Sequence, residues 1–410
     1  MDKKIRNFQF YAIAILACAS LPIAVFGGLA LAFICAGASF IALLGFPYLD
    51  LKILLARDNK IISLAFILLL LWAAFSMQWT LNEKAAFSVW IRVALLVISA
   101  GFLLAFSGMD IAPEKKPAFG RWVTYSFIAA LSLAFFEYIT DGLIIRTIEA
   151  YILGNKDYIP KISKMTRGAC YISLMFWAVA AYMGQHKGKT LILGILTLIV
   201  LSRLVSLSAV MGFITGSLVF IFVSRYGKRK FDLPLIGVII LSIVIFPVIH
   251  LFTNPAAIGE MHLLPLSSLH RLYIWQFSTQ KITEKPLLGW GFDSSPFIPG
   301  GNDFIIGRAQ DYWKYLPLHT HNHIIQLWLE LGIIGPLLLA AIFSGMFSAI
   351  RKSAFPVPVK AALAALVMDY FTIGMTGFGI WQFWWLGAGF LSAAILLLVA
   401  ERDVGEKSKM

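Results

Sequence analysis

Residues 233–252 read LPLIGVIILSIVIFPVIHLF, an apolar run without Asp, Glu, Lys or Arg. A helix needs about 20 predominantly apolar residues to cross the hydrocarbon core of a bilayer, because each residue advances it by about 1.5 Å. The run has that length and that composition. It therefore predicts a membrane-spanning α-helix.

Comparable apolar runs recur between Phe8 and Ala400, separated by short polar breaks. They predict about twelve transmembrane helices, at residues 9–27, 29–46, 61–79, 86–106, 121–140, 168–185, 190–206, 208–224, 233–252, 322–350, 359–378 and 381–400. The composition agrees, since 60% of the 410 residues are hydrophobic and only 13% are charged. Soluble domains carry about 25% charged residues. We expect an all-α integral membrane protein in which residues 1–410 form a single polytopic domain.

The net charge of +13 comes mostly from Lys and Arg in the short breaks between the apolar runs. If the N-terminus is cytoplasmic, the basic breaks fall on one side of the membrane, among them residues 3–6, 228–230 and 351–360. Short loops rich in Lys and Arg stay in the cytoplasm. Both termini are therefore expected there. Because membrane topology explains the basic excess, we expect membrane lipids as partners and no nucleic acid.

This topology leaves two substantial segments on the outer face, residues 141–167 and residues 253–320. Within the longer one, residues 267–285 have helical periodicity that places Arg271, Trp275 and Ser278 on one face of an amphipathic helix. The helix is expected to stop at Pro286. Residues 292–317, rich in Pro, Gly, Asn and aromatic side chains, are expected to form an irregular cover or a solvated connector.

The densest polar cluster is Leu318-His319-Thr320-His321-Asn322-His323, directly before the tenth predicted span. If one helix runs through this cluster and onward, Gly332 lies within about 20° of His321 around the helix axis, and Gly335 within about 40°. Small residues there would let another helix pack closely. The spacing predicts an imidazole held at the membrane surface. Interface histidines and an adventitious metal cluster are the alternatives.

Arg203 lies near the outer end of the seventh predicted span. A guanidinium at that depth is costly unless it has an anionic partner, and its planar fork suits phosphate oxygens. The alternative is an arginine that extends to lipid head groups. Arg167, Arg271 and Arg308 are projected to the same face. Together the four arginines are expected to cradle a pyrophosphate.

Carboxylates outside the predicted spans have no metal-ligand spacing; they include Glu260, Glu284, Asp293, Asp303 and Asp311. We therefore expect no carboxylate-held divalent metal and no cofactor. Three further carboxylates, Glu137, Glu330 and Asp369, lie near or inside spans and are interpreted as partners that lock helices together. Glu330 is not expected to act as a catalytic acid.

Several motifs together resemble the O-antigen ligase family, which shares a domain with O-antigen and exopolysaccharide polymerases. They are Arg203-x3-Leu207, Arg271 followed by Trp275, Pro286-Leu287-Leu288-Gly289-Trp290-Gly291, and His321-Asn322-x9-Gly332-x2-Gly335. The resemblance implies a GT-C-like, lipid-donor glycosyltransferase fold with a long periplasmic loop in the bacterial inner membrane. It also implies metal-independent transfer of a glycan from undecaprenyl pyrophosphate to a sugar hydroxyl of lipid A-core.

Carried over residue by residue, Arg203 and Arg271 match the family's essential arginines, and His321 matches its essential histidine. His319, Asn322, Arg167 and Arg308 are assigned as further substrate-binding residues. A sugar diphosphate already has a good leaving group, so catalysis needs charge stabilisation and removal of a proton from the acceptor. The arginines suit the first task and the His321 imidazole suits the second.

Other activities also fit the sequence. A polymerase that joins repeat units on the same lipid carrier would use the same residues and differ only in its acceptor. A protein oligosaccharyltransferase is expected to carry a longer extracytoplasmic domain. A transporter or flippase would have many helices too, but the sequence shows neither the internal repeats nor the midplane polar site of such proteins. A membrane scaffold would leave the cost of Arg203 unexplained.

Overall fold

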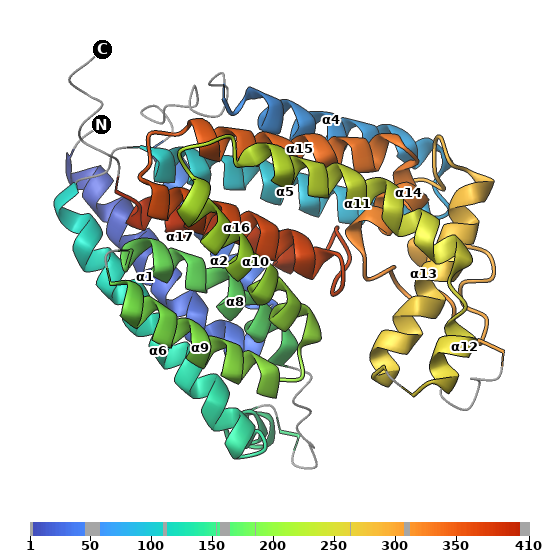
Figure 1. The fold of residues 1–410 in the computed structure, drawn as a ribbon, viewed down its shortest axis with the longest axis horizontal. Coiled ribbons are helices and arrows are strands. Elements are labelled where there is room, and N and C mark those ends of the chain that lie inside the picture. The colour runs from blue at the N-terminus through green and yellow to red at the C-terminus, as the bar shows by residue number, and fades with distance from the viewer. Residues whose placement is uncertain are drawn as a thin grey trace.

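The computed structural model describes residues 3–45, 58–109, 113–152, 154–155, 165–184, 186–262, 264–306 and 312–401. Within these ranges the fold is all-helical, and its one extended pairing is an isolated bridge between Phe304 and Lys314. Figure 1 shows long helices packed side by side, with a smaller helical segment at one end. The protein is an all-α integral membrane protein, as predicted.

Eight of the described helices are long and apolar enough to cross a membrane. They are α1 (Lys3–Gly27), α4 (Lys60–Ser76, continued by a 3₁₀ turn at Met77–Trp79), α5 (Glu83–Gly108), α6 (Lys116–Ile139), α10 (Leu207–Tyr226), α11 (Asp232–Phe252), α15 (Ile334–Lys352) and α16 (Val357–Gly374). Four shorter helices match further predicted spans: α2 (Ala30–Leu43), α8 (Thr166–Tyr182), α9 (Lys187–Arg203) and α17 (Phe383–Val399). The total of about twelve spans stays a prediction.

The predicted continuous span at 322–350 is wrong. Helix α14 (His323–Leu331) ends at Gly332, and α15 begins at Ile334. Gly332 has a φ of +61°, which a residue with a Cβ adopts only with strain. The apolar pattern continues across this position, so the pattern alone gives no sign of the break.

A backbone contact explains the break at Gly332. The turn at residues 286–291 packs on the end of α14, where the Trp290 N–H donates to the Leu329 carbonyl at 2.8 Å and the Gly291 N–H donates to the Glu330 carbonyl at 2.9 Å. A Cβ at Gly332 would lie 2.1 Å from the Leu287 carbonyl oxygen. Gly332 therefore admits a neighbouring turn. The prediction that it lies on a helix face beneath His321 was wrong.

The start of α1, the start of α6 and the end of α17 lie at one end of the molecule. The Lys115 ammonium donates to the Asn7 side chain, and the Lys116 ammonium donates to the Ala400 carbonyl at 2.6 Å. In Figure 1 the helices α12 (Pro255–Glu260) and α13 (Leu266–Glu284) lie far from this end. The long segment between α11 and α14 thus belongs to the opposite end of the bundle.

The helix predicted at residues 267–285 is confirmed as α13. The segment that follows it is packed against α4 and α5 through the turn that joins them: Thr80 Oγ1 donates to the Phe292 carbonyl at 2.7 Å and lies 2.9 Å from Ser294 Oγ. It contains a 3₁₀ turn, η6 (Ser295–Phe297). Its described part is an ordered neighbour of the helix bundle, so the solvated-connector interpretation was wrong.

Two of the carboxylates interpreted as helix locks have that role. Asp369 on α16 accepts from Ser173 Oγ at 2.6 Å and from Trp177 Nε1 at 2.8 Å, which joins α16 to α8. Glu137 accepts from the backbone N–H groups of Ile144 and Ile145 and so caps the short helix α7 (Leu143–Thr147). The sequence contains no signal for either set of partners, because all of them come from other elements or from a local turn.

Candidate functional site

His321 lies two residues before α14, with a left-handed φ of +56°. Its Nδ1 is 2.8 Å from the carbonyl oxygen of Gly377, in the turn between α16 and α17. A carbonyl oxygen can only accept, so Nδ1 carries the proton and the neutral ring presents a lone pair at Nε2. A non-glycine residue in this conformation costs about 1–3 kcal/mol, and such residues cluster at functional sites.

The environment of His321 keeps its imidazole neutral at pH 7. The pKa of His321 is lowered from 6.5 to about 4, chiefly by burial and in smaller part by the positive charge of Arg271, against the opposing effect of the Gly377 carbonyl. The lone pair at Nε2 is therefore available near neutral pH. The geometry is that of a general base oriented by a backbone carbonyl.

His319 contacts both the ring and the backbone of His321. The two rings have centroids 4.1 Å apart, and the His321 backbone N–H donates to His319 Nδ1 at 3.2 Å. The other ring nitrogen of His319, Nε2, lies 2.8 Å from the side-chain amide nitrogen of Gln382. Burial, with the nearby charges of His321, His323 and Arg271, lowers the pKa of His319 to about 2. In the structure His319 is a neutral acceptor that holds the His321 backbone.

His323 is separated from this pair. It is the first residue of α14 and packs its ring edge-on against Tyr370 of α16, with centroids 6.4 Å apart. Within the part of the chain that the structure describes, the three imidazoles form no group suited to a metal ion. The alternative of an adventitious metal cluster therefore receives no support from their arrangement.

Helix α13 brings Arg271 to the histidines. One turn after Arg271, Trp275 Nε1 donates to the Thr320 carbonyl at 2.7 Å, which pins the helix against the segment that holds both His319 and His321. Arg271 is close enough to lower the pKa of each imidazole. The sequence placed Arg271 and Trp275 on one helix face, and the structure turns that face toward His321.

The Arg271 guanidinium is half-buried and forms no hydrogen bond or ion pair with a described residue. Its own pKa is lowered by burial, which penalises an unpaired cation. A partly desolvated arginine of this kind gains most from an anion with several oxygens, because the planar fork can donate to two of them. The charge and partial burial of Arg271 are thus chemically suited to a phosphate-bearing group.

Arg203 is the last residue of α9 and is exposed, without a hydrogen bond or ion pair to any described residue. The start of α10, a few residues later, packs beside the turn that orients His321: Ser208 Oγ donates to the Thr376 carbonyl at 3.0 Å. Arg203 therefore lies at the same end of the bundle as Gly377. No direct contact with His321 joins it to the site.

Arg167 lies at the start of α8, with its guanidinium 5.7 Å from the ring centroid of Trp384. Trp384 donates to the Gln382 amide oxygen at 3.0 Å, and that amide contacts His319. Arg167 is thus connected to the histidines through two side chains. Arg308, the fourth predicted arginine, lies outside the described residues.

Asn322 has a structural position that its motif does not reveal. Its Oδ1 accepts from the Ile325 N–H at 3.0 Å, so the residue caps the N-terminus of α14. Its side-chain nitrogen is buried without a partner among the described residues. The cap fixes where α14 begins and so sets the position of His321, one residue earlier.

Sequence reasoning missed the groups that complete the site. Gly377 and Gln382 orient the histidines from the turn between α16 and α17, and no motif marks them. Arg92 on α5 lines a cavity of about 140 Å³ with Trp381 and Phe383. Arg92 lies inside the predicted span 86–106, where an unpaired guanidinium is costly, as was argued for Arg203. The sequence therefore contained a signal for this residue.

Beside that cavity, the buried carboxyl group of Glu330 interacts with the half-buried carboxyl group of Asp293. Glu330 accepts from Ser295 Oγ, from Trp381 Nε1, from Gln326 Nε2 at 3.0 Å and from the Asp293 N–H at 3.1 Å. Burial, together with the charge of Glu330, raises the pKa of Asp293 to about 7. Glu330 therefore joins α14 to two other segments, as its interpretation as a helix lock requires.

Known proteins resemble this chain in sequence. A family model described as O-antigen ligase matches residues 190–340, a range that contains Arg203, Arg271 and His321. Two curated relatives carry the provisional name polysaccharide ligase. The one from Rickettsia conorii is 31% identical over 328 residues, covering 78% of this chain and 77% of its own. The one from Rickettsia felis is 31% identical over 352 residues, covering 80% and 83%.

Proposed function

Because this chain belongs to the O-antigen ligase family, we propose that it transfers a glycan from undecaprenyl pyrophosphate to a sugar hydroxyl of lipid A-core. The single observation that carries the proposal is the arrangement of His321, whose Nδ1 is tied to the Gly377 carbonyl while the unpaired cation of Arg271 lies nearby. One group is suited to take a proton, and the other is suited to hold a diphosphate.

In the proposed reaction the acceptor hydroxyl gives its proton to Nε2 of His321 as its oxygen attacks the anomeric carbon of the donor sugar. The bond from that carbon to the diphosphate oxygen breaks, and undecaprenyl pyrophosphate leaves with the electron pair. Arg271 stabilises the negative charge that develops on the leaving oxygen. The proton on His321 is then released to water or to the diphosphate.

The same two residues also couple donor binding to base strength. With no anion bound, the positive charge of Arg271 helps to keep the pKa of His321 near 4. A diphosphate on Arg271 offsets that charge, so the pKa of His321 rises toward the range in which an imidazole accepts a proton efficiently. His321 thus becomes a better base once the donor is in place.

Arg203, Arg167 and Arg308 are proposed as further contacts to the donor. Arg203 is supported by its exposure and by its place at the same end of the bundle as Gly377. Arg167 is supported by its path through Trp384 to the histidines. Asn322 and His319 support the reaction by positioning His321.

We further propose a topology in the bacterial inner membrane. Both termini are cytoplasmic, residues 141–167 and 253–320 are periplasmic, and the active site faces the periplasm, within one membrane domain of residues 1–410. The contacts of Lys115 and Lys116, which bring the start of α1 and the end of α17 to the same end of the molecule, support this topology. The positive breaks in the sequence support the cytoplasmic side.

The test is a reconstitution of the purified protein in liposomes with an undecaprenyl-pyrophosphate-linked glycan and lipid A-core, in the presence of EDTA. We expect transfer by the wild type and its loss in both His321→Ala and Arg271→Ala. Two exposed residues serve as matched controls, His262→Gln and Arg146→Ala, and both should leave transfer unchanged. Transfer retained in His321→Ala would overturn the base assignment. Lengthened glycans on the donor lipid, without an acceptor product, would identify a polymerase instead.

A further inference from the structure

A basic cavity lies at the end of the bundle where α10 and α15 end and α11 and α16 begin. It has a volume of about 460 Å³ and lies between the turn after α10 and the turn after α15. Five lysine and arginine side chains contribute to its lining: Lys228, Arg229, Lys230, Arg351 and Lys360. The proposed active site lies on the other side of the membrane and makes no use of this cavity.

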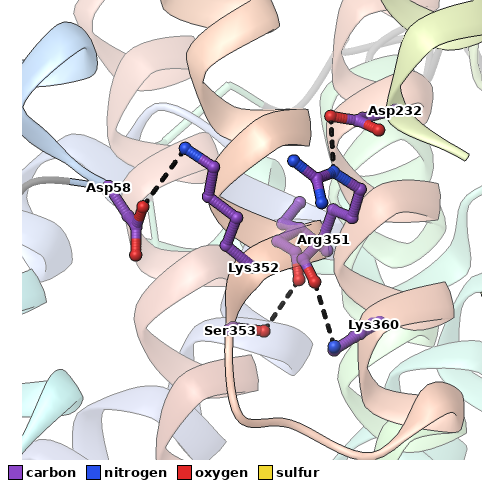
Figure 2. A network of polar contacts seen from close by, with 7 residues as sticks. Asp58, Asp232, Arg351, Lys352, Ser353 and Lys360 are labelled. Carbon is purple, nitrogen blue, oxygen red and sulfur yellow. Dashed lines mark hydrogen bonds and ion pairs between the residues drawn. The ribbon is translucent and has the colours of Figure 1, made fainter. Parts of the chain in front are cut away.

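The walls of the cavity are held by specific contacts. Figure 2 shows Arg351 at the centre: its Nε donates to Asp232 Oδ2 at 2.8 Å, and its carbonyl accepts from Lys360 Nζ at 3.0 Å. The two turns also pack tightly, because a Cβ at Gly227 would lie 2.8 Å from Val357 Cγ1. The cavity is therefore a built feature of four helix ends.

None of the described residues that line this cavity is acidic. Asp232 is paired with Arg351. Lys228, Arg229 and Lys230 are exposed and make no ion pair with a described residue. A concave site with a surplus of one charge concentrates counter-ions, so this cavity attracts an anion.

Apolar surface beside the cavity indicates what kind of anion fits. Phe355 and Val357 form part of its lining. The adjoining helices expose large apolar side chains, with Ile221 of α10 at 63% and Leu233 of α11 at 58% of their full exposure. A free phosphate would use only the cationic part. A molecule with a phosphate head and hydrocarbon tails would use both.

We propose that this cavity binds the head group of an anionic phospholipid of the adjacent leaflet. The phosphate lies among Lys228, Arg229 and Lys230, and the acyl chains run along the exposed apolar faces of α10 and α11. Basic pockets between membrane helices on the cytoplasmic side bind anionic head groups in this way. The lipid connects the turn after α10 with the turn after α15 and so stabilises the packing of α10 on α16.

The test compares the full-length protein in phosphatidylcholine nanodiscs that contain increasing fractions of phosphatidylglycerol or cardiolipin. Thermal unfolding and lipid retention in native mass spectrometry report binding. The variant Lys228→Gln/Arg229→Gln/Lys230→Gln removes three charges from the cavity. A charge-matched control, Arg121→Gln/Lys187→Gln/Lys189→Gln, removes three charges near the starts of α6 and α9 that do not line the cavity.

The cavity variant removes three cations that lie around one head group, so we expect about 100-fold weaker lipid binding in that variant. The control is expected to bind as the wild type does. Equal losses in the two variants would overturn the proposal in favour of a general surface attraction. Stabilisation by inorganic phosphate alone, equal to that by the lipid, would overturn the assignment to a phospholipid. Glycan transfer is measured separately, so its absence leaves this test intact.

Discussion

Replacing Arg271 with Gln tests the link between the arginine and the histidine directly. The side chain stays polar and of similar length, but the positive charge is lost. Removing one group that stabilises developing negative charge costs about 10²–10³-fold in rate, or about 2.7–4 kcal/mol. We expect a decrease of that size in kcat/KM for transfer to lipid A-core.

The pH dependence gives the sharper readout. Protonation of His321 removes the base, so activity is lost as the pH falls through the pKa of His321, which is about 4 in the wild type. Without Arg271 one positive neighbour is gone, and the protonated form becomes easier to reach. Burial still disfavours it, so we expect the pKa of His321 in the variant to lie between about 4 and the ordinary value of 6.5.

The assay is the pH profile of kcat/KM between pH 4 and pH 8, measured for the wild type, for Arg271→Gln and for the exposed control Arg146→Gln. The acid limb should move to higher pH in Arg271→Gln alone. An acid limb that stays in place, or moves to lower pH, would refute the electrostatic coupling between Arg271 and His321. A rate decrease without any shift would leave Arg271 as a donor contact only.

Three further substitutions test how the site is held. Gly332→Ala should lower the free energy of unfolding by about 1–3 kcal/mol or more, because Gly332 has a φ of +61° and no room for a Cβ. The control Gly237→Ala should be tolerated, because a Cβ there would have no atom within 4 Å. Equal effects of the two substitutions on thermal unfolding would contradict the role of the turn at residues 286–291. Glu330→Ala should cost at least about 3 kcal/mol in unfolding by heat, since it leaves buried donors unpaired. Trp275→Phe removes the bond to the Thr320 carbonyl and should lower kcat about 10-fold with a smaller effect on stability; an unchanged kcat would show that α13 is held by other contacts.

Much of the membrane fold follows from local properties of the sequence. An apolar run such as residues 233–252 folds as a helix in lipid, because a helix pairs the backbone N–H and C=O groups of the run with each other by hydrogen bonds. The observed α11 spans Asp232–Phe252, and α13 spans Leu266–Glu284 against a prediction of 267–285. Both ends of α13 were readable, since proline lies on either side of it. Arg271 and His321 were selected as candidates because each is an ionisable residue expected near the membrane surface and belongs to a motif that resembles the family.

The geometry of the site was decided by tertiary contacts between distant segments. The Gly377 carbonyl that orients His321 lies 56 residues further along the chain, and no periodicity relates the two. The end of α14 at Gly332 was likewise set by the turn at residues 286–291, although the surrounding pattern is uniformly apolar. Hydrophobic patterns specify which residues enter the membrane, because that is a property of each segment. Hydrogen bonds at the site depend on where segments meet, which the packing of the whole chain decides.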